Sequence, residues 1–151
     1  MPRFRFQLQA VLDVRLRAER EERRRVGELE TARRRLEDGL RRRQAQIGEA
    51  RNQLRDRLAG PIDASSLRGQ ANASLAEMRD AQRVVLELAG IHRRLEAVRE
   101  DLRAASRARR AVELLKERRF ETWRLEQDRL EQAELDEMAV IRGSRRTVES
   151  L

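Results

Sequence analysis

Apolar residues recur every seven positions along most of this chain, in two phases three or four residues apart. In the first half these seam positions hold Leu8, Leu12, Val26, Leu29, Leu36, Leu40, Ile47 and Leu54. In the second half they hold Val84, Leu88, Ile91, Leu95, Val98, Leu102, Val112, Trp123, Leu130 and Val140. Such spacing over many heptads is typical of a coiled coil, because it lines up the apolar side chains on one stripe of each helix.

The composition excludes most catalytic chemistry. Of 151 residues, 41% are charged and only 3% are aromatic, which argues against a thick globular core. The chain has no cysteine, and His92 is its one histidine, so thiol chemistry and the usual zinc sites are excluded. No phosphate-binding loop, zinc-protease motif or nucleophile elbow occurs. We therefore expect no catalytic residue, no metal ligand and no cofactor, and we predict that the protein is not an enzyme.

The heptad pattern breaks near the middle of the chain, where Gly, Pro, Asp and Ser gather in residues 59–66. Further on, Ser74 and Glu77 have the spacing of a capping box at a helix start. The sequence predicts one all-α coiled-coil domain over residues 1–151. Its expected elements are helix 1 over about 4–58, a turn over about 59–73, helix 2 over about 74–142 with a cap at Gly143, and a frayed tail over 143–151.

Two helices joined by a short connection usually fold back on each other, so we expect a long antiparallel two-helix hairpin. In such a pair the numbers of facing residues have a constant sum, and the heptad phase allows 124, 131 or 138. A sum of 131 pairs seven apolar layers, such as Leu36 with Leu95, whereas 124 pairs five, such as Leu36 with Leu88. A sum of 138 also gives seven but needs a longer loop. We therefore expect 131.

All four aromatic residues lie at the open end of the hairpin in any of these registers: Phe4, Phe6, Phe120 and Trp123. Helix 2 also extends past helix 1 there by about 10–15 residues, or about 20 Å. In one interpretation the aromatic rings only hold the open end together. In the other, this end and its extension dock into a partner.

The net charge of +8 is uneven, because residues 1–60 carry +7 and residues 61–151 carry +1. Arginine runs occur at 23–25, 33–35 and 41–43. Such a face suits phosphates or a partner's carboxylates, although pairing with interspersed Glu is the simpler interpretation. No aromatic lies among the runs, which makes nucleic acid the weaker candidate partner. Without an apolar run long enough for a membrane span or a secretory signal, we expect a cytoplasmic protein.

Two terminal segments carry motifs that go beyond a generic coiled coil. The opening motif consists of Phe4, Phe6, Leu8, Val11, Leu12 and Asp13. The closing motif consists of Leu114, Leu115, Arg118, Arg119, Trp123, Glu126, Leu135, Asp136, Glu137, Ala139 and Arg142. Together the two segments resemble the FliJ family of flagellar type III export proteins. The predominance of arginine over lysine and the glycines within helix 1 depart from the family pattern, and the central region matches too weakly to carry over any residue.

The resemblance implies a stalk-like coiled coil that inserts its joined ends into the hexameric export ATPase (FliI-like). It also implies contact with the export gate protein (FlhA-like), escort of substrate chaperones, and a location at the inner face of the cell membrane at the flagellar base. The residues expected to contact the ATPase are Phe4, Phe6, Leu8, Leu12, Leu115, Arg118, Arg119, Trp123, Glu126, Asp136, Glu137 and Arg142.

Two alternatives remain open beside the stalk. One is a scaffold coiled coil, and the other is an arginine-rich coiled coil that binds nucleic acid. Long two-helix hairpins also pair into four-helix bundles, so a second copy of the chain is a further candidate partner.

Overall fold

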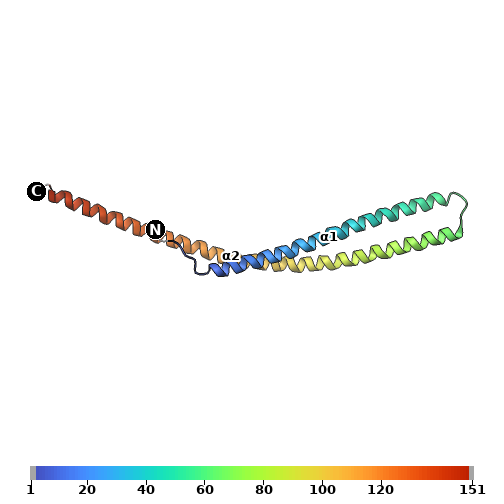
Figure 1. Ribbon diagram of the computed structural model, residues 1–151, viewed down its shortest axis with the longest axis horizontal. Coiled ribbons are helices and arrows are strands. Elements are labelled where there is room, and N and C mark those ends of the chain that lie inside the picture. The colour runs from blue at the N-terminus through green and yellow to red at the C-terminus, as the bar shows by residue number, and fades with distance from the viewer. Residues whose placement is uncertain (1–2, 150–151) are drawn as a thin grey trace. The chain divides into compact units, whose positions relative to one another are not determined.

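The fold is all-α and consists of two long helices packed against each other, as predicted. The computed structural model describes the backbone of residues 3–149 and the side chains of residues 3–142. Helix α1 spans Gln9–Arg57 and helix α2 spans Ala64–Glu149. Figure 1 shows α1 in blue to green, and α2 from green to red, joined by one turn.

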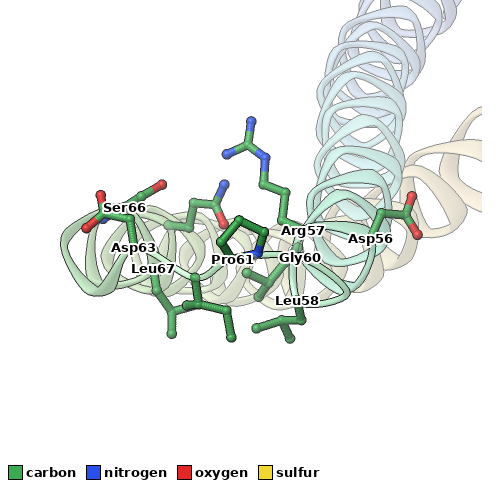
Figure 2. A pocket seen from close by; sticks show the side chains of 11 residues that line it. Asp56, Arg57, Leu58, Gly60, Pro61, Asp63, Ser66 and Leu67 are labelled. Atoms are coloured by element: carbon green, nitrogen blue, oxygen red, sulfur yellow. The ribbon is translucent and has the colours of Figure 1, made fainter.

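The turn is short because Asp63 caps α2. Its carboxylate accepts hydrogen bonds from the backbone N–H groups of Ser65 (3.2 Å) and Ser66 (3.3 Å), the second and third residues after it. This is the geometry of an N-cap, which satisfies two of the free amides at a helix start. Figure 2 shows Asp63 and Ser66 on one side of a hollow formed by the turn, with Pro61 between the two helix ends.

Several predicted boundaries are therefore wrong. Helix α2 begins at Ala64, ten residues before the predicted start, and Ser74 lies inside it. The capping-box pattern at Ser74 misled the prediction, since Asp63 already supplies the cap. At the other end α2 continues to Glu149, so Gly143 is not a C-cap and residues 143–149 are helical. No described glycine has the positive φ that a left-handed C-cap requires.

Residues 3–8 form an extended lead-in and a turn, whereas the sequence predicted helix from Phe4. Phe4, Phe6 and Leu8 are buried or half-buried, while the alternate residues Arg3, Arg5 and Gln7 are exposed. A period of two is what an extended segment produces when one side packs against a neighbour. The first helical turn is preceded by a bond from the Gln9 N–H to the carbonyl of Phe6, at 3.1 Å.

The chain divides into two compact units, which we describe separately. The terminal unit comprises residues 1–18 and 105–151, and the turn unit comprises residues 19–104. In a helical pair each residue contacts only neighbours within a few turns, so a long pair separates readily into units. The single coiled-coil domain expected over 1–151 stays a prediction.

The register in both units is close to a sum of 124, so the predicted 131 is wrong by one heptad. In the turn unit Arg43 pairs with Asp80 at 3.4 Å, which corresponds to a sum of 123. In the terminal unit the Lys116 Nζ donates to the Gln9 side-chain carbonyl at 2.8 Å. The physical reason is the turn, because a helix that starts at Ala64 leaves too few loop residues for the larger sum.

Burial agrees with the shorter register. Leu95 and Leu88 are the buried aliphatic residues of the turn unit, with 2% and 9% of their surface exposed. At a sum of 124 they face Leu29 and Leu36, which are half-buried. Glu19 is also buried, and its carboxylate accepts from Arg23 at 3.0 Å. Arg33 occupies a seam position and is ion-paired with Glu30 at 2.9 Å, which lets a charged side chain lie beside the apolar stripe.

Three glycines inside α1 lower its stability without an evident packing role. A Cβ added at Gly27, Gly39 or Gly48 would meet nothing within 4 Å, and none of the three has a positive φ. We expect each Gly→Ala substitution to raise the free energy of unfolding by about 1 kcal/mol. Urea denaturation should show a higher midpoint with an unchanged slope. The reverse substitution Ala45→Gly, also on exposed α1 surface, should lower the midpoint by a similar amount; an unmoved midpoint in all four variants would contradict this account.

The Asp63 cap should be sensitive to acid. Hydrogen bonds from the Ser65 hydroxyl (2.7 Å), and then from the two backbone amides, lower the pKa of Asp63 below its ordinary value of 3.8. A carboxyl whose pKa is lower in the folded state stabilises that state above its unfolded pKa. The contribution is lost as the pH falls below 3.8 and through the folded pKa.

We therefore expect Asp63→Ala to lower the melting temperature by about 2–4 °C at neutral pH. The difference from the unsubstituted protein should shrink as the pH approaches 3. Asp63→Asn is the matched control, since it keeps a cap acceptor without a titrating group. If the difference in melting temperature between Asp63→Ala and the unsubstituted protein did not change with pH, the charge of Asp63 would not act through the cap.

Candidate partner-binding end

The terminal unit brings together aromatic residues that are more than 110 positions apart in the chain. The ring of Phe4 lies 5.3 Å from that of Phe120 in an edge-to-face arrangement and 5.8 Å from that of Trp123. Phe120 and Trp123 stack at 5.8 Å. These separations are within the range in which aromatic pairs attract beyond simple burial. The three rings form what we call the aromatic clasp.

Phe6 lies one step further along the extended segment and is buried, with 8% of its surface exposed. The Lys116 ammonium and the Arg119 guanidinium each lie 6.0 Å from the centre of its ring, at the limit of cation–π attraction. Lys116 also donates to Gln9, whose amide in turn donates to Asp13 at 2.9 Å. The start of α1 is thus held to α2 by a small polar network beside the buried ring.

The predicted contact residues fall into two groups. Phe6 and Leu12 are buried, and Phe4, Leu8 and Trp123 are half-buried, so they hold the hairpin together and present little surface. Phe120 is the exception among the four aromatic residues, since 43% of its surface is exposed. The remaining predicted residues are exposed on α2: Leu115, Arg118, Arg119, Glu126, Asp136, Glu137 and Arg142. Their assignment as contact residues stays a prediction.

Beyond the clasp, α2 continues with no other described segment of the terminal unit beside it (Figure 1, orange to red). We call residues 126–142 the overhang. Every residue from 128 to 142 is exposed, as expected for a helix without a partner. The overhang carries six carboxylates and two arginines, a net charge of −4. A register sum of 124 makes the overhang longer than predicted, because residue 3 then faces α2 near residue 121.

The overhang also exposes large apolar side chains that sequence reasoning did not single out as contact residues. They are Leu130, Leu135, Met138, Val140 and Ile141, and each has between 46% and 71% of its surface exposed. Leu130 and Val140 continue the heptad seam past the end of α1, and this continuation was the available signal. Large apolar side chains exposed on a helix without a covering element are typical of a binding surface.

The clasp is expected to stabilise the open end of the hairpin. A double-mutant cycle on Phe4→Ala and Phe120→Ala should give a coupling free energy of about 0.5–1.5 kcal/mol, because both rings lose the same contact. Chemical denaturation of the two single variants and the double variant measures it. The pair Phe4→Ala and Leu130→Ala is the control, since the two side chains share no contact we describe; strict additivity in both cycles would contradict the clasp.

A scan against family models matches the chain to the Flagellar FliJ protein family over residues 4–147. The chain belongs to the FliJ family. The resemblance drawn from the two terminal motifs is thereby confirmed, and the match extends across the central region as well. No curated protein and no solved structure gives a significant match.

Membership makes this chain a flagellar export-associated protein. The family is generally structural rather than enzymatic. Among the described residues, no cluster of three or more His, Asp or Glu side chains is arranged to hold a metal ion. Within residues 3–149, no helix combines the length and the apolar character needed to cross a bilayer.

Proposed function

We propose that this FliJ-family protein acts as a stalk for the flagellar export ATPase. The terminal unit inserts into the central opening of the hexameric ring, promotes its assembly and activity, and links it to the export gate. Escort of substrate chaperones belongs to the same proposal. The protein then works in the cytoplasm, peripherally at the inner face of the membrane at the flagellar base.

One observation carries the proposal: α2 extends beyond the clasp as a bare helix with exposed apolar side chains and a net negative charge. A single helix is narrow enough to enter the opening of a ring of subunits, since its diameter with side chains is about 10–12 Å. The clasp joins the two chain ends behind the overhang, so the inserted element is anchored to a paired segment of the same unit. The family motif residues lie on both parts.

A stalk influences its ring only if it binds different subunit conformations with different affinities. The overhang offers two kinds of contact for such discrimination. Its apolar side chains favour conformations that expose an apolar lining, and its carboxylates favour conformations that present basic groups. Asp136 and Glu137 are two of these carboxylates, and they lie between Leu135 and Met138 in the sequence.

The test removes apolar contacts without disturbing the clasp. We expect the triple variant Leu130→Ala, Leu135→Ala and Met138→Ala to lower the affinity for the export ATPase, and the stimulation of its ATP hydrolysis, by at least about tenfold. Deletion of residues 128–151 should abolish both effects while the melting temperature of the hairpin stays nearly constant, because the clasp residues are retained.

The matched control removes equally exposed apolar groups from the turn unit, with Leu75→Ala, Val85→Ala and Leu86→Ala. This variant should bind and stimulate the ATPase as the unsubstituted protein does. Full stimulation by the deletion variant would reject the placement of the overhang in the ring. Equal losses in both triple variants would show that the contact is not confined to the overhang.

A further inference from the structure

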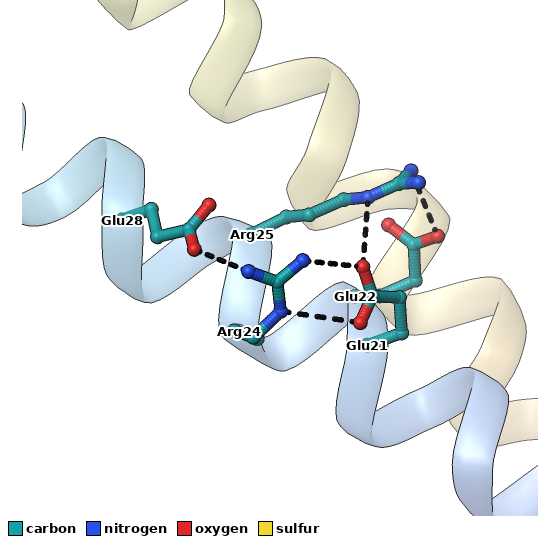
Figure 3. Close-up of polar contacts among 5 residues, drawn as sticks. All are labelled: Glu21, Glu22, Arg24, Arg25 and Glu28. Carbon is teal, nitrogen blue, oxygen red and sulfur yellow. Dashed lines mark hydrogen bonds and ion pairs between the residues drawn. The ribbon is translucent and has the colours of Figure 1, made fainter.

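The arginines of the turn unit differ in how far their charge is compensated. Around residues 21–28 each guanidinium has carboxylate partners: Arg24 pairs with Glu21 at 2.7 Å and with Glu28 at 2.5 Å, and Arg25 pairs with Glu22 at 3.3 Å. Figure 3 shows these side chains as a closed network along one side of α1. The positive charge of these arginines is balanced by carboxylates of the same helix, so it is not available to a partner.

Two turns further along α1 most of this compensation is missing. Arg34, Arg35, Arg41 and Arg42 are all exposed, and we call them the arginine patch. Asp38 is the one carboxylate among them, at 3.5 Å from Arg41. In the described part of the chain, no ion pair is found for the other three patch arginines. The Glu37 carboxylate forms an ion pair with Arg33 instead, at 3.6 Å.

The heptad spacing places the patch on one face. Residues 34 and 41, and likewise 35 and 42, are seven apart and so lie along the same side of a helix, about 10 Å apart. This side is away from the seam, where Leu36 and Leu40 are half-buried. The four guanidiniums therefore take no part in holding α1 to α2. The fold gives no reason for their clustering.

We propose that the arginine patch binds the anionic headgroups of a lipid bilayer. Guanidinium groups form paired hydrogen bonds with phosphate oxygens, and a cluster of four to eight basic residues on one helix is sufficient for attraction to an anionic membrane surface. The patch forms two short rows, residues 34 and 41 and residues 35 and 42, on the exposed side of a helix, and together these rows suit a broad surface. Lipids diffuse laterally in a bilayer, so their phosphates take up the spacing of the guanidinium groups.

Two features favour lipid over nucleic acid. The turn unit has no aromatic residue, so it offers no platform on which single-stranded bases stack. A duplex presents phosphates at fixed spacing along a curved path, and specific binders usually contact more of them than four arginines reach. No large apolar side chain lies between the patch arginines except the seam residues Leu36 and Leu40, so the helix rests on the headgroups without insertion.

The experiment is flotation of the full chain with phosphatidylcholine vesicles that contain or lack phosphatidylglycerol. We expect binding to the anionic vesicles only, with a steep decrease as salt increases. The quadruple variant R34Q, R35Q, R41Q and R42Q should bind more than about tenfold more weakly, since each basic residue near the surface contributes about fivefold. Far-UV circular dichroism should show the same helix content in both proteins.

The matched control carries the same loss of charge at scattered positions on α2: R68Q, R79Q, R93Q and R103Q, all exposed in the turn unit. It should bind within about threefold of the unsubstituted protein if the cluster matters rather than the net charge. Equal loss in the two variants, or no binding of the unsubstituted chain to anionic vesicles, would overturn the proposal. So would duplex DNA that binds more tightly than vesicles at equal salt and depends on the same four arginines.

Discussion

The structure depends on one seam between α1 and α2, and the register of that seam depends on where α2 begins. Asp63 sets this start by accepting two backbone amides of the first turn. A helix that begins there leaves a turn of only a few residues, which fixes the facing positions near a sum of 124. Within the turn unit the Arg43–Asp80 ion pair agrees with that register, and within the terminal unit the contact of Phe4 with Phe120 does so as well.

A two-helix pair has little interior, and this limits how it is stabilised. Among the described side chains only Phe6, Leu12, Leu88, Leu95 and Glu19 are buried. The pair therefore supplements apolar burial with ion pairs that cross the seam, as between Glu30 and Arg99, and with aromatic contacts at its open end. Exposed pairs of this kind contribute little individually, so stability is spread thinly over many small contacts.

The terminal unit separates the two tasks that the sequence motifs had combined. The opening motif, with Phe4, Phe6 and Leu8, is used to clasp the chain start to α2. The closing motif continues beyond the clasp into the overhang, where its charged and apolar side chains face outward. Family residues therefore lie both in the part that is held together and in the part that is free to bind. In the proposed function, the clasp positions the overhang and the overhang supplies the contact surface.

The seven-residue repeat by itself determined an all-α hairpin with the aromatics at its open end, because periodicity is a local property of the chain. The repeat did not determine the register, because the sequence pattern allows Leu36 to face either Leu88 or Leu95. The choice between the two depends on the cap at Asp63. The extended segment at Phe4 and Phe6 was missed for a related reason: its period of two is meaningful only when α2 lies beside it. The length of the exposed overhang was likewise decided by tertiary pairing, which determines which apolar groups are left without a neighbour.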